Sequence, residues 1–170
     1  MPVIRQYESI ERATGRPKVQ MLVILLFLFC LAFGRAYACP QYPQPALEMG
    51  KVTLSSGNSS HQFLVELAKT DQQRACGLMG RPRLADGRGM LFDMRPAGPA
   101  YFWMENTPEP LDMVFVDAEG KIIHLERNAV PYSRRKRGTD RPVSAVLELA
   151  AGTIEQLKIH VGDQLTLPWK

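Results

Sequence analysis

Residues 111–126 read LDMVFVDAEGKIIHLE and carry the clearest structural signal in this chain of 170 residues. Two apolar, β-branched-rich runs, 111–116 and 121–126, flank Asp117-Ala118-Glu119-Gly120, which has the composition of a tight turn. The pattern predicts a β-hairpin. Strand-like runs continue on both sides of it, and we expect further strands at 51–54, 62–67, 90–94, 100–105, 143–149 and 164–167.

Helix signals are few. Thr70-Asp71-Gln72-Gln73 has the form of a capping box, and a short helix starting there should end at Gly77, where a left-handed cap suits glycine. One or two further helical turns are expected at 153–158. The chain is therefore predicted to be mainly β (β-rich α+β), a small antiparallel barrel-like sheet with one or two short helices.

The N-terminal part resembles an export signal. Residues 21–33 form an apolar run of thirteen, shorter than the roughly 20 residues that span a bilayer. The small-x-small step Ala36-Tyr37-Ala38 follows, as in a signal peptide. We expect a signal peptide over 1–38, cleavage between Ala38 and Cys39, and a periplasmic or secreted protein; retention of the leader as an anchor stays open.

Charge supports the same interpretation. The chain has 21 Lys+Arg against 17 Asp+Glu, and the leader holds five of the basic and two of the acidic residues. The remainder is nearly neutral, so a nucleic-acid partner is not expected. The one concentrated basic run, Arg134-Arg135-Lys136-Arg137, should lie in a loop, either solvated or facing an anionic envelope surface.

We expect a Pro-rich linker at 39–50 and a single β-rich domain at 51–170. Without the leader the chain keeps Cys39 and Cys76, which could form a disulfide in an oxidising compartment. The sequence favours the simpler alternative, with Cys39 on a loose tail and Cys76 buried. A lipid anchor at Cys39 is not favoured, because the preceding residues form a poor lipobox.

Five linked stretches carry a family resemblance: FLVELA at 63–68, GLMGR at 77–81, GMLF at 89–92, FWMENT at 102–107 leading into PLDMVF at 110–115, and VLEL at 146–149 with Gly152. In order and spacing they resemble the bacterial and archaeal family called domain of unknown function 192. The resemblance implies a small β-rich barrel-like domain, often with an export leader, and no established biochemical role. The chain departs from the family pattern at Gly80 and Glu105, where an aromatic and a basic residue are usual.

The best site candidate is the segment 103–112. The chain must leave the sheet at Asn106-Thr107-Pro108, because proline lacks a donor and forces the preceding residue into an extended form. Asn106 and Thr107 either hydrogen-bond the backbone of this turn or present polar groups at a pocket mouth beside Trp103.

Two carboxylates, Asp112 and Glu148, lie within otherwise apolar strand runs. Buried carboxylates need partners. We favour structural pairing with Arg81 or Arg83, or with backbone N–H groups, over joint acid and base catalysis by a hydrolase-type enzyme. Arg81 could also bind a carboxylate or phosphate of a ligand.

Methionines are plentiful between residues 79 and 113, and thioethers suit Cu(I). Handling of a soft metal (copper) through Met79, Met90 and Met104 is therefore a further alternative, although their spread over separate apolar strands favours core packing. No nucleotide-binding or zinc-hydrolase motif occurs, so no cofactor is expected.

The leading expectation is an exported, non-enzymatic binding or accessory module of the cell envelope. Its partner would be an unknown small ligand, a peptide segment or an envelope protein. The expected pocket residues are Arg81, Trp103, Asn106, Thr107, Asp112 and Glu148.

Overall fold

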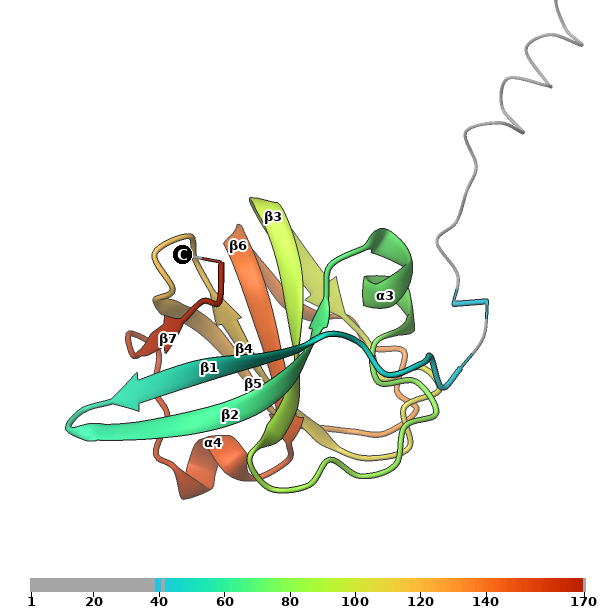
Figure 1. Ribbon diagram of the computed structural model, residues 1–170, viewed down its shortest axis with the longest axis horizontal. Helices are drawn as coiled ribbons and strands as arrows, with labels where there is room; N and C mark the ends of the chain where they lie inside the picture. The colour runs from blue at the N-terminus through green and yellow to red at the C-terminus, as the bar shows by residue number, and fades with distance from the viewer. Residues whose placement is uncertain (1–38, 41, 170) are drawn as a thin grey trace, which may run out of the picture. The chain divides into compact units, whose positions relative to one another are not determined.

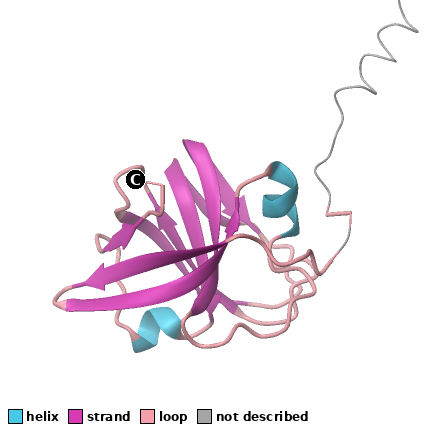
Figure 2. Cartoon of the chain, in the orientation of Figure 1, coloured by secondary structure: helices cyan, strands magenta, loops and turns pink. Residues whose placement is uncertain are grey.

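The computed structural model describes residues 39–40 and 42–169. The expected signal peptide, with Ala38 at its end, lies outside the described residues. Strands dominate the described part, as Figure 2 shows. In chain order the elements are β1 Met49–Ser56, β2 Ser59–Ala68, α3 Asp71–Cys76, β3 Arg88–Phe102, β4 Leu111–Val116, β5 Ile122–Ala129, β6 Arg137–Ala150, α4 Thr153–Gln156 and β7 Gln164–Thr166. The expected mainly β fold is confirmed.

The strands form one seven-stranded sheet in the order β5-β4-β6-β3-β2-β1-β7. The sheet curls so that its two edges meet (Figure 1). Lys121, just before β5, forms a bridge with Gln164 of β7, and the N–H of Leu165 donates to the carbonyl of Gly120 at 2.8 Å. A Cβ on Gly120 would lie 2.3 Å from the carbonyl oxygen of Leu165, so this contact requires glycine. The expectation of a barrel-like sheet is thus confirmed.

Two details differ from the sequence-based expectation. Strands β2 and β3 pair in parallel, whereas the other paired strands are antiparallel. The crossover that parallel pairing needs is the segment 69–87, which contains α3. The two strands expected at 90–94 and 100–105 are one strand, β3, which ends at Phe102 and shifts register against β6 between Asp93 and Gly98.

The predicted capping box is confirmed at the start of α3. The N–H of Gln73 donates to Oγ1 of Thr70 at 3.2 Å, and the N–H of Thr70 donates to Oε1 of Gln73 at 3.0 Å. The last helical residue is Cys76, and Gly77 caps it with a φ of 46° and a ψ of −130°. This differs from the expected left-handed cap, but the positive φ still suits a residue without a Cβ. Local hydrogen bonds therefore fix both ends of α3.

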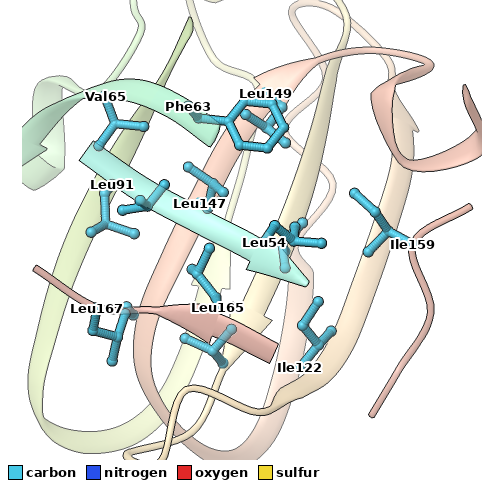
Figure 3. Packing of buried hydrophobic residues seen from close by; sticks show 14 of the residues in the cluster. Leu54, Phe63, Val65, Leu91, Ile122, Leu147, Leu149, Ile159, Leu165 and Leu167 are labelled. Carbon is cyan, nitrogen blue, oxygen red and sulfur yellow. The ribbon is translucent and has the colours of Figure 1, made fainter. Parts of the chain in front are cut away.

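The sheet has an apolar cluster on each face because alternate strand residues point in opposite directions. The inner cluster fills the curled sheet (Figure 3) and includes Leu54, Val65, Leu91, Val114 and Leu147. The outer cluster covers the opposite face of β3, β4 and β6 and includes Met90, Phe92, Met113, Phe115 and Val146. The central strands are buried on both faces, which explains their nearly continuous apolar sequences.

Cys39 does not lie on a loose tail, and that expectation is wrong. Cys39 forms a disulfide with Cys76 at the end of α3. Gln44 is buried, and its Nε2 donates to the carbonyls of Gln73 at 3.1 Å and Gly77 at 2.9 Å. These partners lie about 30 residues away or more, so no local sequence pattern marks them. Cys39 and Gln44 are therefore both fastened to α3 and the turn after it.

We expect the double variant Cys39→Ser, Cys76→Ser to unfold with a free energy about 2–3 kcal/mol lower than the wild type. A disulfide stabilises mainly by restricting the unfolded chain, by about 2–4 kcal/mol for loops of this length. The contacts of Gln44 keep the segment partly ordered in the variant. Urea unfolding followed by circular dichroism measures the difference, and a loss below about 0.5 kcal/mol would show that the cross-link is unimportant.

Candidate functional site

A pocket of about 430 Å³ opens on the outer face of the sheet, against α3. We call it the outer pocket. Its walls come from α3 and the turn after it, from β3, from the chain just after β3, and from β6 with the residue before it. The lining residues include Arg74, Ala75, Cys76, Met79, Phe92, Tyr101, Phe102, Trp103, Thr107, Lys136 and Glu148. Three of the expected pocket residues are among them, Trp103, Thr107 and Glu148, together with Met79, which was considered as a metal ligand.

Aromatic rings form the apolar part of the outer pocket. Phe92 and Phe102 meet edge to face with ring centroids 4.9 Å apart, and Phe102 packs on Phe115 at 5.9 Å. Such contacts hold the rings in fixed orientations. Trp103 is 50% exposed, so its ring is accessible at the wall.

Glu148 is the unusual group in the outer pocket. It is only 4% exposed, and its neighbours across the sheet are Met90 of β3 and Met113 of β4, both from the outer cluster. No described residue donates a hydrogen bond to its carboxylate or forms an ion pair with it. Burial in these apolar surroundings raises the pKa of Glu148 to about 8. The side chain is therefore mostly neutral at pH 7.

Thr107 and Asn106 shape the turn that follows β3. Thr107 is buried, its Oγ1 donates to the carbonyl of Glu105 at 3.2 Å, and it also lines the outer pocket. Asn106 has a φ of 53°, and its carbonyl accepts the N–H of Gly80 at 2.8 Å. Thr107 thus both hydrogen-bonds the backbone of the turn and lines the pocket. Asn106 connects the turn to the chain after α3 through its backbone carbonyl.

Arg81 lies elsewhere. It forms an ion pair with Glu66 at 2.9 Å and donates to the carbonyl of Pro45 at 3.1 Å. It lines a separate pocket of about 210 Å³, and its Nε is buried without a partner. The expected pairing of Arg81 with Asp112 or Glu148 is not present.

Asp112 binds backbone amides on the inner side of the sheet. Its Oδ1 accepts the N–H of Asn128 and its Oδ2 the N–H of Ile154, each at 2.8 Å. In the register of β4 and β6, Asp112 lies opposite Leu149 of the inner cluster, whereas Glu148 lies opposite Met113 of the outer cluster. The two carboxylates therefore face opposite sides of the sheet. A hydrolase that uses them as a pair lacks the shared cleft that it needs.

The three methionines considered as copper ligands do not lie in an arrangement that could hold a metal ion together. Met90 and Met104 are completely buried in the outer cluster, and of the three proposed ligands only Met79 lines the outer pocket. Core packing, the favoured alternative, accounts for the two buried side chains. Within residues 39–40 and 42–169, no group of three His, Cys, Asp or Glu side chains is placed to hold a metal ion.

The basic run is only partly a loop. Arg137 is the first residue of β6 and is buried, with its Nη1 donating to the carbonyl of Arg135 at 2.8 Å. Arg134 pairs with Glu105 at 2.6 Å. Lys136 lines the outer pocket, a role that its sequence context did not indicate. The aromatic residues of β3 were also missed as site residues, because apolar strand residues resemble ordinary core.

The fold and the outer pocket define a small, curled β-sheet domain with an accessible pocket that is lined by aromatic rings and a largely buried carboxyl group. The chain belongs to the DUF192 family, described as an uncharacterised family, whose sequence profile matches residues 52–167. The resemblance seen in the sequence is confirmed.

Two solved structures are similar to this chain. A protein from Sinorhizobium meliloti, named as a candidate transcription regulator, is 40% identical with a TM-score of 0.70, over 72% of this chain and 96% of that one. A protein of unknown function from Novosphingobium aromaticivorans is 37% identical with a TM-score of 0.70, over 78% of this chain and 94% of that one. No curated protein matches the chain. None of the helices in its described part is long and apolar enough to cross a membrane.

Proposed function

We propose that this protein is an exported component of the cell envelope that binds a small ligand or a peptide segment in the outer pocket, without catalysing a reaction. The observation that carries the proposal is Glu148, a buried carboxyl group without a partner in the described chain, which lines an accessible pocket. Among the described residues, Nε of Arg81 is the side-chain N or O atom that is fully buried without a partner. The carboxylate oxygens of Glu148 therefore reach the water of the pocket, and a ligand that hydrogen-bonds them takes the place of that water.

The other walls fit a binding role. Pockets for small molecules are concave and mostly apolar, measure about 300–1,000 Å³ and contain few polar groups. The outer pocket, at about 430 Å³, falls within this range. Its rings are fixed by mutual packing, so little ordering is needed when a ligand binds. Asp112, the other buried carboxylate, is occupied by backbone amides, so the site has no carboxylate pair for acid and base chemistry.

Export is supported by the signal-like leader and by the disulfide between Cys39 and Cys76, since disulfides persist in oxidising compartments. The disulfide also bears on membrane attachment. A lipid anchor at Cys39 would need a thioether at the same sulfur that bonds Cys76. We therefore expect release by cleavage before Cys39, without lipid. The mass of the protein isolated from the periplasm checks this, and a diacylglyceryl mass increment would contradict it.

A neutral aromatic probe, 2-phenylethanol, should bind in the outer pocket. We expect titration to shift the amide NMR signals of residues 74–79 and 101–107 with millimolar affinity. Ala75→Phe should weaken binding at least tenfold, because Ala75 lines the pocket and a phenyl group there would fill it. Gln72→Phe is the matched control, since Gln72 is an exposed residue of the same helix outside the pocket.

The control variant should bind like the wild type. If 2-phenylethanol produces no shifts in the wild type, or if Ala75→Phe and Gln72→Phe bind it equally well, the outer pocket is not a ligand site.

A further inference from the structure

The chemistry around Glu148 narrows the class of ligand, and this inference rests on the proposed function. The carboxyl group is buried, lines the outer pocket and receives no hydrogen bond from the described chain. In the ionised state it would need a cation or several donors. The described protein supplies neither, so the donors come from water in the pocket or from a ligand that displaces it.

The cations at the pocket are not partners of Glu148. Arg74 pairs with Asp71, and its Nη1 donates to the carbonyls of Lys69 at 2.7 Å and Asp93 at 2.9 Å. Lys136 is an exposed residue that lines the pocket, and it forms no ion pair with Glu148. Arg74 is therefore engaged by its own neighbours.

The remaining walls are suited to a cation. Phe92, Phe102 and Trp103 line the pocket, and aromatic faces attract ammonium groups by about 0.5–2 kcal/mol, most strongly for tryptophan. The same rings provide the apolar surface for an uncharged body. A ligand with both features would match the carboxyl group and the rings together.

We propose that the outer pocket binds a small molecule or peptide group in which a primary ammonium is joined to an apolar body. The ammonium group pairs with the carboxylate of Glu148, and the apolar body contacts Phe92, Phe102 and Trp103. A pocket of this volume accommodates a body of about one or two rings.

Proton release distinguishes this ligand from a neutral one. Glu148 is mostly protonated at pH 7, since its pKa is about 8, and pairing with an ammonium requires the ionised form. Binding should therefore release a proton, and affinity should rise with pH up to about 8.

The titration of the other ionisable groups near the pocket can be distinguished from the titration of Glu148. Arg74 and Lys136 line the pocket as cations, and the hydroxyl of Tyr101 bonds to Asp140, which raises the pKa of Tyr101 above its usual value. The ring of His124 packs against Phe115 with ring centroids 5.1 Å apart, and its Nε2 lies 3.3 Å from Oε1 of Glu126. A Glu148→Gln variant leaves all of these groups in place.

The test compares 2-phenylethylamine with 2-phenylethanol, which differ in the ammonium group alone. Calorimetry at pH 7 in two buffers of different ionisation enthalpy gives both affinity and proton release. For the wild type we expect the amine to bind at least tenfold more tightly than the alcohol and to release roughly 0.9 proton, the fraction protonated at one pH unit below the pKa. Glu148→Gln should abolish both the preference for the amine over the alcohol and the release of the proton.

Each other result overturns the inference. If the alcohol binds the wild type as tightly as the amine, the ligand class is wrong while the proposed pocket stands. If the amine is preferred but Glu148→Gln keeps that preference, or no proton is released, then Glu148 is not its partner. If neither probe binds the wild type, both the inference and the proposed function fail.

Discussion

Replacing Asp112 with alanine is expected to lower the free energy of unfolding by about 3–5 kcal/mol. The carboxylate accepts the N–H groups of Asn128 and Ile154, which come from two separate parts of the chain, β5 and α4. Asp112 is only 1% exposed, so water cannot readily replace these bonds. Each buried N–H left without an acceptor costs about 1–3 kcal/mol, and hydrogen bonds to a charged group are the stronger kind.

Two comparisons make the Asp112 prediction specific. Asp112→Asn keeps one acceptor oxygen but turns an NH₂ group toward the other N–H, so an intermediate loss is expected. Asp86→Ala is the control, because Asp86 is exposed and makes no hydrogen bond within the described chain; a change within about 0.5 kcal/mol is expected. Urea unfolding measures all three. A loss below about 1 kcal/mol for Asp112→Ala would mean that Asp112 does not hold β5 and α4 together.

The second large effect is a fall in stability as pH rises from about 5 to 8. Glu148 has a pKa of about 8 in the folded protein against 4.5 as its ordinary value, so the folded state binds more protons than the unfolded state between these values. Stability therefore decreases with rising pH across this interval and levels off above it. At about 1.4 kcal/mol per pH unit, the loss from Glu148 amounts to about 3–4 kcal/mol between pH 5 and pH 8.

The variant Glu148→Gln isolates the contribution of Glu148 to the pH dependence of stability, because a glutamine side chain cannot ionise. We expect the difference in unfolding free energy between variant and wild type to change by the same 3–4 kcal/mol from pH 5 to pH 8, in favour of the variant at the higher pH. Urea unfolding at pH 5, 6, 7 and 8 gives the two curves. Parallel curves would show that Glu148 titrates alike in the folded and unfolded states.

The parts of the fold that the sequence predicted are those fixed by local contacts. The capping box at Thr70 joins residues three positions apart, and the hairpin of β4 and β5 is set by its own turn. The parallel pairing of β2 and β3 and the disulfide of Cys39 depend instead on segments brought together from far along the chain. Neither has a local sequence signal.

In the candidate site, too, the sequence could not predict what depends on contacts between distant parts of the chain. The sequence identified Asp112 and Glu148 as buried carboxylates but could not assign their faces, because β4 and β6 are apolar on both sides. Opposite faces give them opposite surroundings: two backbone donors for Asp112 and an apolar pocket for Glu148. Arg81, the expected partner, is paired with Glu66 on a neighbouring part of the sheet.

Glu148 is expected to carry a carboxyl group without a protein partner that a ligand can reach, and a carbon-13 NMR titration of its carboxyl carbon tests this most directly. The signal is assigned by its absence in Glu148→Gln. We predict a midpoint near pH 8 in the free protein, as burial requires, and a clear decrease of that midpoint at saturating 2-phenylethylamine. A midpoint near the ordinary value of 4.5, or one that the amine leaves unchanged, would show that Glu148 is not the buried carboxyl group that binds the ligand.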